Sequence, residues 1–141
     1  NATELVNDPI DSPVSGGNTE DRPMLAWIFR EEAYTEIYHQ HFSAFISEYF
    51  DSGKFADMID SVKTMIAPYV QDDPTKFCTY EEFETGIDTL KEFCLLRAES
   101  VKGQLSGTIG STAETQGEES FIDAGEMDIS SMGAMGGRMG K

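Results

Sequence analysis

The chain has little positive charge: its 141 residues include 10 Lys and Arg against 26 Asp and Glu, a formal net charge of −16. Nucleic acids and anionic membrane surfaces recruit clustered Lys and Arg, so this balance argues against both as partners. The sequence also lacks any run of about 18 apolar residues, so no membrane-spanning segment is expected. Its length allows one domain and leaves little room for a second.

Histidine and cysteine are scarce, with two of each. His39 and His41 are two positions apart, so on a helix they point to different sides and cannot bind one metal ion together. We expect His39 to be a solvated surface residue and His41 to be a hydrogen-bonded core residue. No Cys/His cluster has the spacing of a zinc site.

The two cysteines are predicted to be far apart. If Cys78 and Cys94 belong to one helix, 16 residues at 1.5 Å each separate them by about 24 Å. A disulfide requires Cα atoms within about 7 Å. Both are therefore expected to be free thiols or to pair outside this chain, and Cys94 to be a buried small hydrophobic side chain.

Aromatic and glycine residues divide the chain into three parts. Fourteen of the 15 aromatic residues lie between positions 27 and 93, whereas eight of the 13 glycines lie in residues 107–141. Because burial requires large apolar side chains, we expect an irregular loop over residues 1–22, a helical domain over 23–106 and a disordered acidic tail over 107–141. A domain of that size buries a small core, which suggests that its helices pack against something missing.

The chain starts at Asn1 with no leader after it, so we expect a processed chain or a piece of a longer one.

Four helices are predicted from apolar spacing and end signals. Apolar residues recur at intervals of three and four over residues 34–50, and Ser52-Gly53 supplies a stop. A short helix begins at Pro23, and another begins near Lys54, with Pro68 expected to break or kink its last turn. Thr79 and Glu82 form a capping box that opens the last helix, which extends to Leu105. No useful stretch alternates with period two, so the fold class is all-α.

Catalytic signatures are missing. There is no glycine-rich phosphate loop, and no Ser/His/Asp arrangement stands out, so the sequence assigns no catalytic, cofactor-binding or metal-binding residue. Four aspartates in proline-containing loops offer carboxylates of the kind that bind Mg²⁺ or Ca²⁺, but without the spacing of an EF-hand. We expect turn and cap roles for these four: Asp8, Asp11, Asp72 and Asp73.

An ordered set of sequence elements carries a family resemblance. The set begins with a leading segment, Asp8-Pro9-Ile10-Asp11-Ser12-Pro13, and five elements follow it. The first three are Arg22-Pro23-Met24-Leu25, the pattern Glu-x-x-Tyr-x-x-x-Tyr from Glu31 to Tyr38, and Tyr49-Phe50-Asp51-Ser52-Gly53. The last two are residues 66–77, Ile-Ala-Pro-Tyr-Val-Gln-Asp-Asp-Pro-Thr-Lys-Phe, and residues 83–97, which continue into Leu96-Arg97-Ala98-Glu99-Ser100-Val101. Together they cover most of residues 5–106. In this order and spacing they resemble the C-terminal part of the CotH-like family, the spore-coat-protein kinases.

That resemblance implies a four-helix C-terminal lobe of an atypical protein-kinase-like fold. The parent protein would transfer phosphate from ATP, with Mg²⁺, to serine or threonine of a protein substrate, and a basic Ser/Thr-rich protein is the expected partner. The family's catalytic groups lie mainly before this segment, so no catalytic residue is carried over and the segment is not competent alone. The helices would support the missing N-terminal catalytic lobe, Asp8 and Asp11 would lie near the nucleotide, and the protein would be found on spores, on the cell surface or outside the cell.

Two further hypotheses stay open at this stage. The first is that the chain is a complete acidic helical binding module for a basic protein, because a charge of −16 speeds association with a cationic surface.

The second is that the kinase phosphorylates seven hydroxyl residues of its own tail. The simpler interpretation is that the tail is a solubilising linker. The seven residues are Thr108, Ser111, Thr112, Thr115, Ser120, Ser130 and Ser131.

Overall fold

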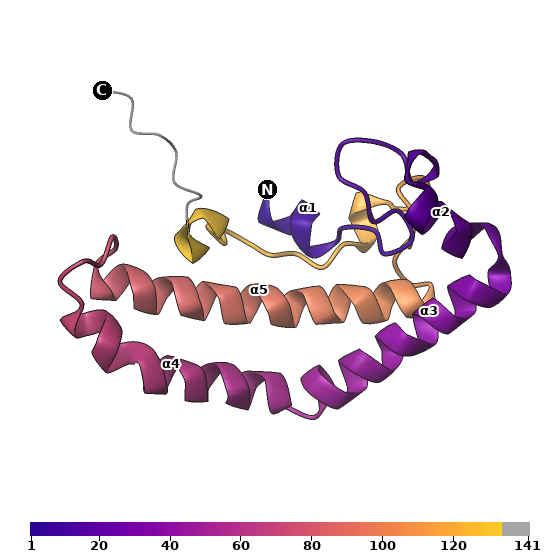
Figure 1. The fold of residues 1–141 in the computed structure, drawn as a ribbon. Coiled ribbons are helices and arrows are strands. Elements are labelled where there is room, and N and C mark those ends of the chain that lie inside the picture. The colour runs from indigo at the N-terminus through magenta and orange to yellow at the C-terminus, as the bar shows by residue number, and fades with distance from the viewer. Residues whose placement is uncertain (134–141) are drawn as a thin grey trace, which may run out of the picture.

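The computed structural model describes residues 1–133, and every regular element in that part is a helix (Figure 1). The predicted all-α fold class is confirmed. No helix in the described part is long and apolar enough to cross a membrane.

The four predicted helices are α2 (Pro23–Arg30), α3 (Glu32–Phe45), α4 (Lys54–Asp72) and α5 (Tyr80–Ser106). A π-helical segment (Ile46–Asp51) prolongs α3, so the aromatic-rich stretch ends at Ser52-Gly53 as predicted. Gly53 has a φ of +78°, the left-handed conformation that glycine adopts without strain. The Thr79–Glu82 capping box opens α5 as expected. Pro68 does not end α4, which continues to Asp72.

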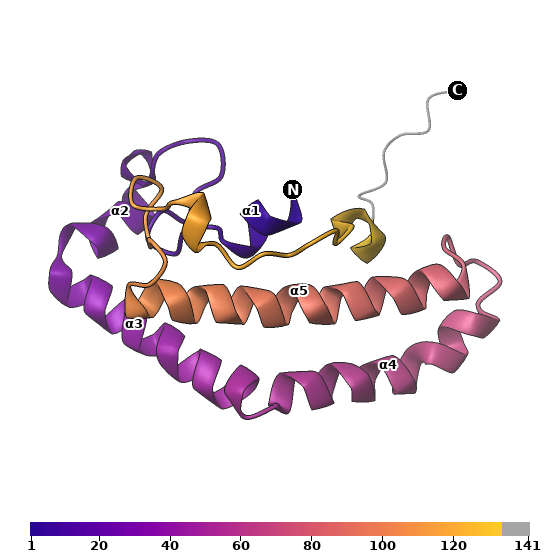
Figure 2. The same ribbon diagram turned by 180° about the vertical axis from the view of Figure 1, so that it is seen from behind.

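Helix α5 is the axis of the fold (Figures 1 and 2). The bent arm made of α3, the π-helical segment and α4 runs along one side of α5. The N-terminal residues, with the short helix α1 (Ala2–Val6), and the chain that follows α5 run along the other side. Three 3₁₀ turns complete the described part: Thr19–Asp21, Glu118–Ser120 and Ile129–Met132.

Both ends of the described chain differ from the sequence-based expectation. In place of an irregular loop, residues 1–22 begin with a capped helix whose Ala2 and Val6 are buried. In place of a disordered tail, residues 107–133 run back over α1 and α5, and Ala124 joins Ala2 and Val6 in one core cluster. The reason is that α2–α5 alone bury little, so a few small apolar residues from the two ends complete the core. Residues 134–141 lie outside the described residues.

A second core cluster joins the N-terminal residues to the helices. Ile10 packs with Ile46, Ala98 and Val101, and Phe42, Phe50 and Leu105 contact this group. The chain after α5 crosses this helix at Gly86, where an added Cβ would lie 2.6 Å from the carbonyl oxygen of Ser131. Glycine is needed at that crossing because any side chain would push the two segments apart.

Candidate functional site

Buried polar side chains gather at one place, around residues 7–11, which we call the anchored segment. Asn7 and Ser100 are fully buried and Gln104 is 3% exposed. Burying polar groups costs free energy unless they are hydrogen-bonded. In this cluster, as elsewhere in the described chain, no buried side-chain polar atom lacks a partner. The cluster is therefore a specific, fully satisfied network.

Asn7 is its hub, because its side chain uses every hydrogen-bonding position it has. The amide Nδ2 donates to the carbonyl oxygens of Thr3 and Ile122, both at 2.8 Å. The Oδ1 atom accepts from Ser100 Oγ at 2.9 Å and from the Ile122 N–H at 3.0 Å. One side chain thus ties α1, α5 and the chain after α5 together.

Helix α5 holds the backbone of the anchored segment with side chains on one face. Arg97 Nη1 donates to the carbonyl oxygens of Val6 at 2.9 Å and of Asp8 at 2.6 Å. Gln104 Oε1 accepts the Ile10 N–H at 2.9 Å, and Gln104 Nε2 donates to the Asp8 carbonyl at 3.2 Å. Positions 97, 100 and 104 repeat at helical spacing, so they form one polar row beside the buried row of Ala98 and Val101.

Helix α3 holds the other end of the segment. Tyr38 donates its hydroxyl to the Ile10 carbonyl at 2.8 Å, and His39 Nε2 lies 2.7 Å from Asp11 Oδ1. The expectation of a solvated His39 is wrong, since its side chain is 30% exposed and paired. The expectation of a core His41 is also wrong, since it is exposed. The physical reason is that α3 faces the core with the side that carries Tyr38 and Phe42. Many of its other apolar and aromatic side chains stay exposed to solvent.

Burial shifts the pKa of two hydrogen-bond donors that hold the anchored segment, Tyr38 and Arg97. Burial, together with the nearby Asp11 carboxylate, raises the pKa of Tyr38 to about 12, against the opposing effect of the Arg97 cation. Burial lowers the pKa of Arg97, while Asp8 and Tyr38 act in the opposite direction. A phenol with this pKa stays protonated at ordinary pH, so Tyr38 remains a donor to Ile10.

The Tyr38 shift predicts a stability change at alkaline pH. A folded pKa raised from 10.0 to about 12 means that the folded chain keeps a proton which the unfolded chain loses. The free energy of unfolding should therefore hold below pH 10 and fall as pH rises from 10 to 12. In Tyr38→Phe this part of the fall should vanish, whereas Tyr69→Phe, at a site 76% exposed, should keep it. Urea unfolding at several pH values measures the slopes, and equal slopes in the wild type and both variants would contradict the assignment.

The four aspartates expected in loops have different surroundings, and Asp72 is not in a loop, because it is the last residue of α4. Asp73 Oδ1 accepts from the N–H and the hydroxyl of Thr75, at 2.7 and 2.6 Å, which confirms its turn role. Asp11 is committed to His39, and its side chain is 11% exposed. Asp8 is exposed, and its carboxylate makes no hydrogen bond or ion pair within residues 1–133. Within the same residues, no three His, Cys, Asp or Glu side chains could hold a metal ion together.

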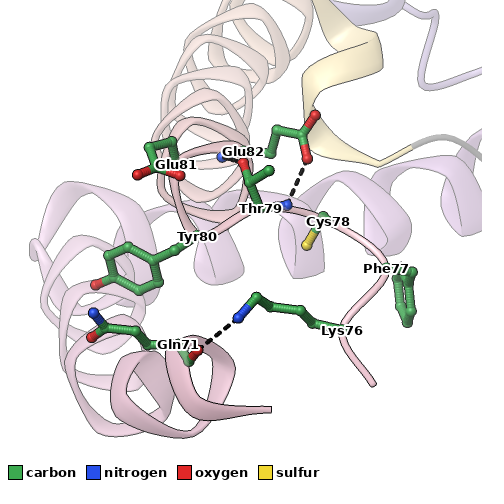
Figure 3. Close-up of a pocket in the computed structure, with 8 residues that line it drawn as sticks. All are labelled: Gln71, Lys76, Phe77, Cys78, Thr79, Tyr80, Glu81 and Glu82. Atoms are coloured by element: carbon green, nitrogen blue, oxygen red, sulfur yellow. Dashed lines mark hydrogen bonds between the residues drawn. The ribbon is translucent and has the colours of Figure 1, made fainter. Parts of the chain in front are cut away.

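A hollow lies at the turn between α4 and α5 (Figure 3). It is lined by Gln71, Lys76, Phe77, Cys78, Thr79, Tyr80, Glu81 and Glu82. Lys76 Nζ donates to the Gln71 carbonyl at 2.7 Å, and the Thr79 N–H donates to Glu82 Oε2 at 2.7 Å. Its main polar groups are thus engaged in closing α4 and capping α5, and no nucleophile–base pair is formed there.

The thiol prediction is confirmed, since both Cys78 and Cys94 are free. Cys94 is partly buried, and burial raises the pKa of its thiol. A raised pKa lowers the thiolate fraction, so Cys94 is a packing residue rather than a nucleophile.

Sequence reasoning missed the α5 side of the anchored segment. Arg97, Ser100 and Gln104 each directly precede an apolar residue of α5, and their shared helical face was the available signal. Asn7 carried no signal of its own, because three of its four side-chain hydrogen bonds join it to residues more than 90 positions away in the chain.

Comparisons with known proteins give one match. A family model described as CotH kinase protein matches residues 4–101, from α1 to α5. No curated protein and no solved structure matches. The matched stretch includes the anchored segment and Arg97, and the chain after α5 lies beyond it.

Proposed function

The chain belongs to the CotH kinase protein family, and we propose that it acts as the C-terminal helical support segment of an atypical protein kinase. In this proposal the parent protein transfers the γ-phosphoryl group of ATP to a serine or threonine hydroxyl. The bond between the γ-phosphorus and the ADP oxygen breaks, a bond to the hydroxyl oxygen forms, and the hydroxyl proton is released. The support segment does not carry out this step alone.

One observation carries the proposal: α3 and α4 have no fully buried residue except at the π-helical segment between them. Large apolar side chains on α2–α4 are instead strongly exposed. They are Met24, Trp27, Tyr34, Ile37, Phe45, Met58, Val62, Met65 and Tyr69. On α4, Met58, Val62, Met65 and Tyr69 follow one another at steps of four, three and four, which makes one continuous stripe. Exposed apolar surface of this extent is typical of a protein interface, and we assign it to the catalytic lobe.

The described residues do not fit the divalent metal that accompanies ATP, because no group of three possible ligands is formed. Phosphoryl transfer also requires a cationic clamp for the phosphates and a residue that orients the nucleophile. We assign nucleotide and metal binding to the catalytic lobe of the parent, and no catalytic residue to this chain. The family membership likewise supports placing the parent at the spore coat, the cell surface or outside the cell.

The proposal predicts that the chain of 141 residues, when studied by itself, exposes an apolar surface to the solvent. It should bind a hydrophobic dye and form oligomers in light scattering. Trp27 is 50% exposed and Tyr69 is 76% exposed, so Trp27→Gln with Tyr69→Gln should lower the dye signal. The control is Gln40→Ala, a change at an exposed polar position. A sharp monomer peak without dye binding would count against the support role.

The second candidate function is an acidic binding module for a basic protein, which the net charge of −16 favours. Long-range attraction between opposite charges is screened by salt, so such binding should weaken steeply between about 0.05 and 0.5 M NaCl. Capture of a basic protein that is insensitive to salt would exclude this alternative. Capture by a chain that neither binds dye nor oligomerises would favour it over the support role.

A further inference from the structure

A groove separate from the anchored segment lies between the first half of α5 and the 3₁₀ turn Ile129–Met132 (Figures 1 and 2). Its volume is about 730 Å³, within the range of about 300–1,000 Å³ that is common for binding pockets. The turn is held on α5 at two points: the Ser131 carbonyl oxygen lies against Gly86, and Ser131 Oγ donates to Thr89 Oγ1 at 2.9 Å. Contacts between described residues therefore fix both walls of the groove.

The lining of the groove is largely apolar. Its large apolar side chains are Phe77, Phe83, Ile87, Leu90 and Met132. Phe77 is fully exposed and Leu90 is 37% exposed, so part of this lining faces solvent. Figure 3 shows the Phe77 ring lying apart from the other labelled side chains of the turn between α4 and α5. Exposed aromatic and aliphatic side chains around a hollow are typical of a surface that another segment covers.

The rim of the groove is acidic. Glu81 and Glu82 are exposed, and they are the charged residues among the described residues that line the groove. Glu82 Oε2 accepts the Thr79 N–H in the cap of α5, whereas the Glu81 carboxylate makes no hydrogen bond or ion pair within residues 1–133. Because the rim offers carboxylates without a cation, the groove favours a segment that is both apolar and positively charged.

Residues 134–141 have this composition. They lie outside the described residues, and their sequence is Ala-Met-Gly-Gly-Arg-Met-Gly-Lys. They carry two methionines and two cations, whereas all 26 acidic residues of the chain precede them. Methionine is flexible and polarizable, so it fits irregular apolar hollows and packs favourably beside aromatic rings.

The position of this segment in the chain also fits the groove. Gly133, the last described residue, itself lines the groove. The eight residues that follow reach up to about 27 Å when extended, whereas the stretch of α5 from Glu81 to Leu90 is about 14 Å long. Every part of the groove is therefore within their reach. A short tether also gives an effective concentration on the order of millimolar, so even weak contacts favour occupancy.

We propose that the groove between α5 and the Ile129–Met132 turn is an intramolecular binding site for residues 134–141. Met135 and Met139 supply the apolar contacts, and the cations of Arg138 and Lys141 face the acidic rim. This inference goes beyond the proposed function and does not depend on it, because it rests on the groove and on the sequence that follows it. A basic segment of another protein has to displace residues 134–141 to bind there.

The test uses Cys78 as a built-in probe, because this thiol lines the groove and Cys94 does not. In the full chain of 141 residues, Met135→Ser with Met139→Ser should speed the alkylation of Cys78 by iodoacetamide by about twofold or more. The two substitutions change no charge, so they do not act on the thiol through electrostatics. Alkylation of Cys94, measured in the same digest by mass spectrometry, should stay unchanged.

The matched control makes the same chemical change elsewhere on the surface. Met24→Ser with Met58→Ser alters sites that are 85% and 51% exposed and do not line the groove, so the Cys78 rate should equal that of the wild type. A synthetic peptide with the sequence of residues 134–141, added to the Met135→Ser, Met139→Ser variant, should restore the slow rate.

Four results would overturn the inference. The first is an equal Cys78 rate in the wild type and the Met135→Ser, Met139→Ser variant. The second is faster alkylation of both cysteines, which would indicate a loosened fold. The third is protection of Cys78 that grows with protein concentration, which would assign the groove to the segment of a second copy. The fourth is equal protection by octalysine, which would assign the groove to basic segments in general.

Discussion

Asn7→Asp should lower the free energy of unfolding by about 3–5 kcal/mol, because it places a charge without a partner in a fully buried site. The Nδ2 of Asn7 donates to two carbonyl oxygens, those of Thr3 and Ile122. A carboxylate oxygen at that position would face both carbonyls with no hydrogen to offer. Burial would raise the pKa of the new carboxyl, and protonation would relieve the repulsion, so the loss should shrink as pH falls from 7 towards 4. Urea unfolding at pH 7 and pH 4 measures both effects.

Asn18→Asp is the matched control for this change. It alters the charge of the chain by the same amount, at an exposed position whose side chain caps no backbone group. Its effect should stay within about 0.5 kcal/mol. Equal effects of the two substitutions would show that Asn7 is not the hub of the network and that the end of the chain after α5 is held in another way.

Ile10→Ala should cost about 2–5 kcal/mol, the range for removing a large side chain from a packed core. Ile10 is 2% exposed and lies against Ile46 of the π-helical segment and against Ala98 and Val101 of α5. The substitution keeps both backbone hydrogen bonds of residue 10, to Gln104 and from Tyr38, so the loss measures packing alone. Leu5→Ala, at a site 45% exposed, should cost less than about 1 kcal/mol.

The comparison between these two variants also tests where the domain begins. If residues 1–22 were an irregular loop, both changes would be nearly neutral. A large loss for Ile10→Ala alone would show that the N-terminal residues are part of the core. Thermal unfolding followed by circular dichroism gives the same ranking and serves as an independent measurement.

The four long helices were predictable because their signals are local. Helical spacing of apolar residues, the Thr79–Glu82 capping box and the stop at Gly53 all act within a few residues of the chain. The family resemblance was predictable for the same reason, since it rests on short elements in a fixed order, and the family match over residues 4–101 confirms it. The net charge and the free state of the two cysteines also followed from the sequence.

The anchored segment was not predictable in this way. Asn7 pairs with Ser100, 93 residues away, and with Ile122, 115 residues away. Such pairs have no local pattern, because each partner is an ordinary polar or apolar residue in its own surroundings. His39 and His41 show the same limit: helical geometry placed them on different sides of α3, but not which side faces the N-terminal residues.

The sequence by itself determined the all-α fold class, the boundaries of α2–α5 to within a few residues, and the family, because these depend on propensity, caps and spacing along the chain. Only the tertiary structure decided that residues 1–12 and 107–133 belong to the core, that Asp11 is occupied while Asp8 is free, and that Arg97 supports the backbone between them. These outcomes depend on which surfaces meet. Burial is a property of the assembled fold, and the free-energy cost of leaving a buried polar group unpaired selects the partners only after distant segments have come together.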